Sequence, residues 1–143
     1  MPRFSSRSSY PRPGLLLGLL LLTGCASPPK PPEPPTLART TAQQRIDAWQ
    51  ELVHELGSAA AEQKLERVNR VFNQLEYVDD ASRWGREDYW ATPLETLSSN
   101  GGDCEDFSIA KYFTLKQLGL PERQMRLIYV KSLSLRQPHM VLG

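Results

Sequence analysis

The sequence lacks any apolar run long enough to cross a bilayer. Its most apolar stretch, residues 14–22, is almost pure leucine, but it is far shorter than the roughly 20 residues that a transmembrane helix needs. The preceding residues 1–13 carry Arg3, Arg7 and Arg12 and no acid. A basic start followed by a short apolar segment is typical of a secretory signal and argues against a membrane-spanning anchor.

An excess of charge of one sign is also missing. The chain of 143 residues has 17 basic and 16 acidic side chains, and no basic patch stands out. Removal of residues 1–24 as a signal leaves 14 basic residues against 16 acids. We therefore expect no nucleic-acid partner. The length allows one domain at most, and there is no internal repeat.

Cysteine occurs only twice, at Cys25 and Cys104, so one disulfide is the most that the chain can form. The segment Leu22-Thr23-Gly24-Cys25 resembles a bacterial lipobox, in which the cysteine is lipidated and becomes the new N-terminus. A plain signal cleaved nearby, with Cys25 incidental, is the alternative. Lipidation of Cys25, with Ala26 behind it, predicts an anchor on the periplasmic face of the outer membrane. Cys104 is then a single thiol in an oxidising compartment, where it must be buried or used.

Proline is concentrated in one segment that predicts a linker rather than a core. Six prolines in this segment favour extended polyproline II: Pro28, Pro29, Pro31, Pro32, Pro34 and Pro35. We therefore expect a signal peptide with a lipobox over residues 1–24, a linker over 25–40 and a folded domain over 41–143.

The domain begins with a helical pattern and ends with strands. Apolar side chains at helical spacing predict one helix from Thr41 to Leu56 and a second from about Ala60 to Glu76. His54 is expected on the surface of the first. Residues 77–91 predict an ordered loop, and Thr92-Pro93-Leu94-Glu95 predicts the capped start of a short helix.

A further helix is predicted from Cys104 to Leu118. Its apolar residues cover most of its circumference, so it should be the central, buried helix. Residues 125–130 predict a strand, 133–137 a turn, and His139 the start of a second strand.

The residue pattern that carries chemistry surrounds Cys104. Gly101 and Gly102 allow a tight backbone approach, and Cys104 follows at the start of a helix. Helix N-terminal N–H groups stabilise a thiolate and can receive an oxyanion. His139 lies 35 residues further on, where a strand running back beside the helix brings an imidazole to the thiol as a general base. A buried inert thiol and a strand-end surface histidine are the alternatives.

Five segments together resemble the bacterial transglutaminase-like cysteine peptidases, a family that includes periplasmic proteases of large biofilm adhesins. The resemblance covers roughly residues 41–143 and is most specific around Cys104. The segments are 78–80, 84–95, 102–112, 125–130 and 139–142.

The resemblance implies an α+β fold of the papain/transglutaminase type, with the nucleophile at a helix N-terminus packed on an antiparallel sheet. It implies Cys104 as nucleophile and His139 as general base and later acid. An aspartate on the next strand completes the family's triad, but no acid occurs after Glu122. We therefore expect the sheet to be incomplete and the C-terminal part of the domain to be missing.

Calcium beside the nucleophile is also implied by the resemblance. The matching acids are Asp103 and Glu105, with Asp106 as a third candidate. Bare acids at this position should raise the thiol pKa, and a bound divalent cation offsets that. Asp103 as a helix cap and Glu105 as a first-turn acid are the alternative. No EF-hand pattern is present. A solvated loop is expected for four upstream acids, Asp79, Asp80, Glu87 and Asp88, and loop packing rather than a substrate groove for three aromatic residues, Trp84, Tyr89 and Trp90.

The resemblance implies a calcium-dependent cysteine endopeptidase of the cell envelope that cleaves a large surface adhesin and so controls biofilm attachment. An amidase or transglutaminase-type acyl transferase on the same scaffold is the first alternative. An inactive truncated relative that only binds a partner is the second. The expected partners are the protein substrate, an inhibitory receptor of the inner membrane, and the membrane itself through the N-terminal lipid.

Overall fold

The computed structural model describes residues 40–133 and 136–143. The predicted signal over 1–24, the lipobox cysteine Cys25 and all but the last residue of the linker over 25–40 lie outside the described residues. Within the described ranges, the helices are too short or too polar to cross a membrane.

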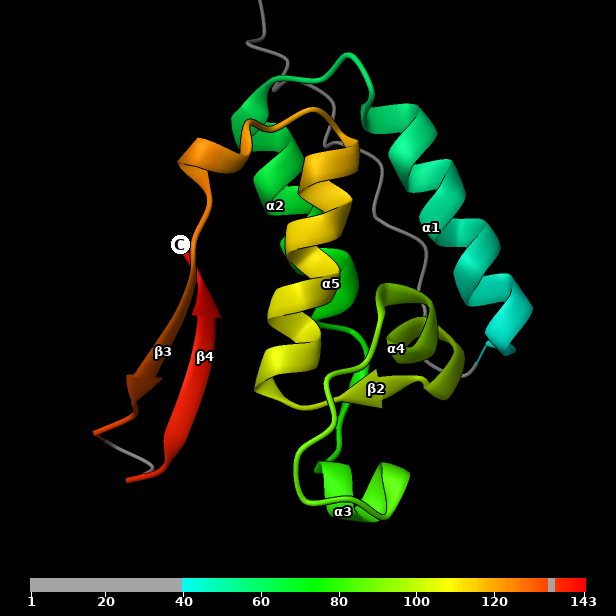
Figure 1. Ribbon diagram of the computed structural model, residues 1–143. Coiled ribbons are helices and arrows are strands. Elements are labelled where there is room, and N and C mark those ends of the chain that lie inside the picture. The colour runs from blue at the N-terminus through cyan, green and yellow to red at the C-terminus, as the bar shows by residue number, and fades with distance from the viewer. Residues whose placement is uncertain (1–39, 134–135) are drawn as a thin grey trace, which may run out of the picture. The chain divides into compact units, whose positions relative to one another are not determined.

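Five α-helices precede a β-hairpin in the described part of the chain (Figure 1). The helices are α1 (Ala42–Leu56), α2 (Ala61–Phe72), α3 (Asp80–Trp84), α4 (Pro93–Ser99) and α5 (Cys104–Gln117), followed by a 3-10 turn, η1 (Glu122–Gln124). The strands are β1 (Glu76–Tyr77), β2 (Gly101–Gly102), β3 (Leu127–Lys131) and β4 (Pro138–Leu142). β1 and β2 are parallel, and β3 and β4 are antiparallel. The predicted α+β class with a small, incomplete sheet is confirmed.

The helix starts follow the capping signals in the sequence. Thr41 caps α1 in a capping box with Gln44, and Thr92 caps α4 in a capping box with Glu95, as predicted for the second of these. His54 is exposed on α1, also as predicted.

Two predictions in the segment before the site were wrong. The second helix ends at Phe72 and not at Glu76, because Glu76 pairs with Gly101 in the β1–β2 ladder. The loop over residues 77–91 contains the short helix α3, which Asp79 caps by accepting a hydrogen bond from the Ser82 N–H at 2.9 Å.

The core is formed where α1, α2 and α4 meet α5. Buried side chains from each of these helices contribute, and each valine, leucine or phenylalanine is worth about 1.5–3 kcal/mol on burial: Leu52, Leu56, Val68, Val71, Phe72, Leu97, Ala110 and Leu115. The Trp49 indole N–H donates to Thr114 Oγ1 at 3.0 Å, which ties α1 to α5. The predicted central position of α5 is confirmed, although Phe113 on its outer side remains 48% exposed.

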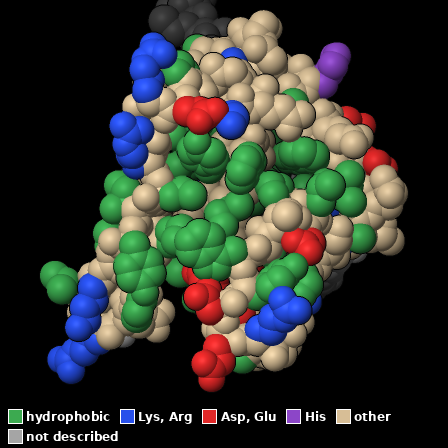
Figure 2. Space-filling view, in the orientation of Figure 1, with side chains coloured by type: hydrophobic (Ala, Val, Ile, Leu, Met, Phe, Trp, Pro, Cys, Tyr) green, Lys and Arg blue, Asp and Glu red, His purple; other side chains and the backbone are tan. Residues whose placement is uncertain are grey.

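The β3–β4 hairpin packs against α5, chiefly through β4 (Figure 1). All five residues of β3 are exposed, and Figure 2 shows apolar side chains gathered over α5 and the hairpin. Because an isolated hairpin is marginally stable in water, its position depends on the contacts that β4 makes with α5.

Candidate active site

A tight turn between α4 and α5 places the start of α5 against β1. Asn100 ends α4 in the left-handed region, with φ 62°. A Cβ on Gly101 would lie 2.2 Å from the carbonyl oxygen of Glu76, and one on Gly102 would lie 2.3 Å from Oδ2 of Asp106. Both approaches exclude any side chain, so the two glycines set the position of the helix start that carries Cys104.

Cys104 is the first residue of α5 and its thiol is free and half-buried. The thiol donates a hydrogen bond to Oε2 of Glu105 at 3.0 Å. Its Sγ accepts the backbone N–H of Met140, on β4, at 3.3 Å. The thiol therefore bridges the helix start to the strand that carries His139.

Cys104 and His139 line the same open cavity, of about 1030 Å³, whose walls come chiefly from α2, α5 and β4. His139 is half-buried and pairs with Val130 of β3. Across residues 40–133 and 136–143, neither the Cys104 thiol nor a carboxylate is hydrogen-bonded to the imidazole. The structure thus brings the two residues to one cavity, while their roles as nucleophile and base remain predictions.

Acidic side chains gather at the N-terminus of α5. Carboxylate oxygens of Asp80, Asp103 and Asp106 lie within 4.8 Å of one another, and so do those of Asp80, Asp88 and Glu105. The prediction that Asp80 belongs to a solvated loop was wrong: Asp80 is 4% exposed, because its Oδ2 accepts the Tyr89 N–H and folds the loop over the site.

Asp106 is fully buried and organises this region. Its Oδ1 accepts the Ala91 N–H at 2.7 Å, and its Oδ2 accepts the Asp103 N–H at 3.4 Å. The other upstream acids, Asp79, Glu87 and Asp88, are exposed as predicted. Sequence reasoning missed Asp80 because only the pairing of Asp80 with Tyr89 reveals its burial.

The crowding of acids shifts the ionisation of the site. Burial, and then the hydrogen bond and charge of Glu105, raise the pKa of Asp103 to about 8. Burial and then the hydrogen bond to Glu105 raise the pKa of Cys104 to about 11, although the Met140 N–H acts in the opposite direction. The helix N-terminus alone would lower the thiol pKa, so burial and the acids together outweigh it.

The donor set fits a hard cation such as calcium. Oδ1 of Asp80 and Oδ1 of Asp103 are buried and have no hydrogen-bond partner within the described ranges. Unpaired buried carboxylate oxygens are costly, and a cation bound by several carboxylates removes that cost. The predicted ligands Asp103 and Glu105 and the third candidate Asp106 lie in this acid cluster, and the structure adds Asp80.

Two aromatic residues of the loop, Trp84 and Tyr89, pack on one another, whereas the third, Trp90, is exposed. The rings of Trp84 and Tyr89 lie 4.8 Å apart, and the Tyr89 hydroxyl donates to Oε1 of Glu95 at 2.9 Å. Trp90 is 56% exposed, and its indole N–H donates to Asp88. None of the three lines the cavity that contains Cys104, which agrees with the expected loop packing.

A family model of the bacterial transglutaminase-like cysteine proteinases matches residues 39–143. Calcium-bound LapG of Legionella pneumophila is similar in structure, with a TM-score of 0.66 and 43% sequence identity, over 73% of this chain and 57% of LapG. EGTA-treated LapG gives a TM-score of 0.65 and 44% identity, over 71% of this chain and 54% of LapG. The chain thus spans less than two thirds of these proteins. Among curated proteins, none matches.

Proposed function

Because this chain belongs to the bacterial transglutaminase-like cysteine proteinases, we propose that it carries the nucleophile and the general base of a cysteine endopeptidase. The observation that carries the proposal is the bridge from Cys104, at the start of α5, to the strand of His139. Both residues open onto one cavity that a peptide substrate can enter.

In the proposed reaction, the Cys104 thiolate attacks the scissile carbonyl carbon and forms a tetrahedral intermediate. The free N–H groups at the start of α5 stabilise the oxyanion. His139 takes the thiol proton and delivers it to the leaving amine, which yields a thioester on Sγ. Water then attacks the thioester carbonyl while His139 takes the water proton. The C–S bond breaks, and this proton passes from His139 to Sγ as the product acid departs.

We further propose that the reaction depends on calcium held by Asp103, Glu105, Asp106 and Asp80. The solved relatives include LapG in calcium-bound and EGTA-treated forms. In this chain, the unpaired buried oxygens of Asp80 and Asp103 support the same requirement. A bound divalent cation would neutralise the acids that raise the Cys104 pKa. Glu105 would then bind the cation instead of accepting the hydrogen bond from the Cys104 thiol.

The experiment that tests the peptidase exposes a defined mixture of peptides to the calcium-loaded full-length protein and analyses the products by mass spectrometry. New peptide ends that vanish in Cys104→Ala and in His139→Ala support the endopeptidase. Conversion of glutamine side chains, without new ends, would support the acyl-transferase alternative. No Cys104-dependent product at all would favour the inactive relative.

The expected substrate is a large surface adhesin, as the family resemblance implies, and an inhibitory receptor of the inner membrane is the further partner. A lipidated Cys25 would hold the enzyme at the periplasmic face of the outer membrane. Metabolic labelling with a fatty acid should mark the wild type and not Cys25→Ala. Equal labelling of both, or of neither, would remove the anchor from the proposal.

A further inference from the structure

The strand that carries His139 presents one residue whose backbone faces α5. Arg126 and Gly143 exchange both N–H···O bonds across the hairpin. In an antiparallel ladder such pairs alternate with pairs whose N–H and C=O groups point outward. Met140 pairs with Tyr129, three residues back from Gly143, so its backbone groups point away from β3.

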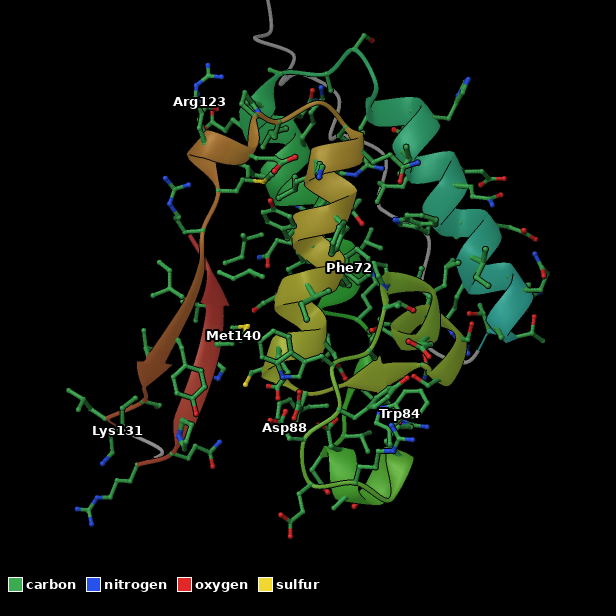
Figure 3. All side chains as sticks on the ribbon, viewed as in Figure 1. Phe72, Trp84, Asp88, Arg123, Lys131 and Met140 are labelled. Atoms are coloured by element: carbon green, nitrogen blue, oxygen red, sulfur yellow. The ribbon has the colours of Figure 1, made fainter. Side chains whose placement is uncertain are left out.

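Two side chains of α5 satisfy both outward groups of Met140. The Met140 N–H donates to Sγ of Cys104 at 3.3 Å, and the Ser108 hydroxyl donates to the Met140 carbonyl oxygen at 3.2 Å. Cys104 and Ser108 are four residues apart, so they lie on one face of the helix, one turn from each other. Figure 3 shows Met140 between β4 and α5.

These two contacts fix the register between nucleophile and base. In the ranges 40–133 and 136–143, Cys104 and Ser108 are the side chains from other elements that hydrogen-bond β4. Ser108 is 5% exposed, so water does not compete for its hydroxyl. His139 directly precedes Met140, so any slip of Met140 along α5 also moves the imidazole.

We propose that Ser108 is a positioning residue that keeps His139 in place during hydrolysis of the acyl-enzyme. The inference rests on the proposed function. Once Sγ carries an acyl group, the thioester sulfur is a poorer acceptor for the Met140 N–H. The bond from Ser108 to the Met140 carbonyl is then the remaining polar tie between the nucleophile helix and the strand of the base.

The two half-reactions should therefore respond differently to loss of the hydroxyl. In the wild type, acylation starts while both hydrogen bonds to Met140 are intact. In Ser108→Ala, the bond from the Met140 N–H to Sγ still holds β4 at this stage. During deacylation in the variant, the Ser108 hydrogen bond is absent and the bond from the Met140 N–H to the thioester sulfur is weakened. Because a displacement of about 1 Å can cost a factor of order 10² in rate, we expect Ser108→Ala to slow deacylation about tenfold and acylation much less.

The test uses p-nitrophenyl acetate with the calcium-loaded full-length protein. His139 takes the thiol proton and releases it to solvent, Sγ takes the acetyl group as a thioester, and p-nitrophenolate leaves in a burst. Water then attacks the thioester carbonyl, His139 takes the water proton, and acetate leaves as that proton returns to Sγ. Burst amplitude and rate report acylation, and the slower steady-state rate reports deacylation.

Ser108→Ala should keep the burst but lose about nine tenths of the steady-state rate, with kcat and KM falling together. Alanine keeps α5 intact because it has the highest helix propensity. Ser108→Thr restores a hydroxyl and should recover turnover. Thr114→Val is the matched control, because it removes a buried hydroxyl of the same helix that does not contact β4. It should lower the melting temperature and leave the burst and turnover unchanged.

Each remaining outcome is decisive. Wild-type burst and turnover in a folded Ser108→Ala would overturn the positioning role alone. Equal loss of both phases in Ser108→Ala and Thr114→Val would assign the effect to stability and would also overturn it. If the wild type shows no Cys104-dependent burst, the proposed function is overturned, and this inference with it.

Discussion

The thiol of Cys104 donates a hydrogen bond to Oε2 of Glu105 at 3.0 Å, although the two residues are consecutive at the start of one helix. Burial and this bond raise the pKa of the thiol and so favour its protonated form. Glu105, which belongs to the proposed cation site, thereby influences the charge of the Cys104 thiol. Occupancy of the acid cluster and reactivity of the thiol are therefore expected to change together.

The first prediction concerns thiol reactivity. In chelator, the rate of Cys104 alkylation by iodoacetamide should rise with pH towards a midpoint near 11, because the thiolate is the reactive form and its pKa is raised to about 11. Calcium should move the midpoint to lower pH. Mass spectrometry of the alkylated protein at each pH measures the rate.

Glu105→Gln provides the control for this prediction. The amide carries no charge, so the midpoint in chelator should fall below that of the wild type, and added calcium should shift it less. A midpoint in Glu105→Gln that equals the wild-type value would show that Glu105 does not hold the thiol proton.

The second prediction concerns stability against pH. Burial and Glu105 raise the Asp103 pKa to about 8 in the folded protein, against about 3.9 in the unfolded chain. Between these values the folded state binds a proton that the unfolded chain has released. The free energy of unfolding in chelator should therefore be greatest below about pH 4 for this group and fall as pH rises to about 8. The raised pKa of Asp106 acts in the same direction.

Urea unfolding at several pH values in chelator measures this slope. Asp103→Asn should flatten it, because the amide does not titrate. Saturating calcium should also flatten it in the wild type, because a bound cation removes the advantage of the proton. A steeper loss of stability in Asp103→Asn than in the wild type would contradict the assignment.

The third prediction separates Asp80 from the neighbouring loop acids. Asp80→Asn should weaken calcium binding by roughly tenfold or more, because the charge count of the ligands tunes affinity in oxygen sites. Glu87→Gln removes one charge from the same loop at an exposed position and should leave the affinity within about twofold. Isothermal titration with calcium measures both, and equal losses would mean that only long-range charge matters.

Local signals predicted the position of the nucleophile and its helix. The caps at Thr92 and the apolar pattern after Cys104 depend on residues within a few positions of one another, so the sequence contains the information for them. The same holds for the strand patterns over residues 125–130 and from His139, which pair as the β3–β4 hairpin.

Pairings between distant residues escaped the sequence. Asp80 looked solvated because its neighbours are polar, yet its burial follows from a hydrogen bond to the Tyr89 N–H. Arg45 shares a face of α1 with Leu52 and Leu56, where a charged residue is unexpected, yet it is 6% exposed and donates to the Ser98 carbonyl of α4 at 2.8 Å. Neither contact can be recognised from the periodicity of apolar residues in the sequence, because each depends on how the elements pack.

The last prediction concerns the close approach that sets the position of α5. In Gly102→Ala the new methyl group would lie 2.3 Å from Oδ2 and 2.6 Å from Cβ of Asp106. Asp106 is fully buried and holds the Ala91 and Asp103 N–H groups, so it cannot move aside without breaking those bonds. We expect a loss of about 1–3 kcal/mol in the free energy of unfolding, or more, together with weaker calcium binding.

Gly57→Ala adds the same methyl group where the nearest atom, the His54 carbonyl oxygen, is 3.5 Å away, so it should leave both quantities almost unchanged. Urea unfolding and calcium titration of the two variants measure both quantities. Equal stability of Gly102→Ala and Gly57→Ala would contradict this account, because the acid cluster would then tolerate a displacement of the helix that carries Cys104.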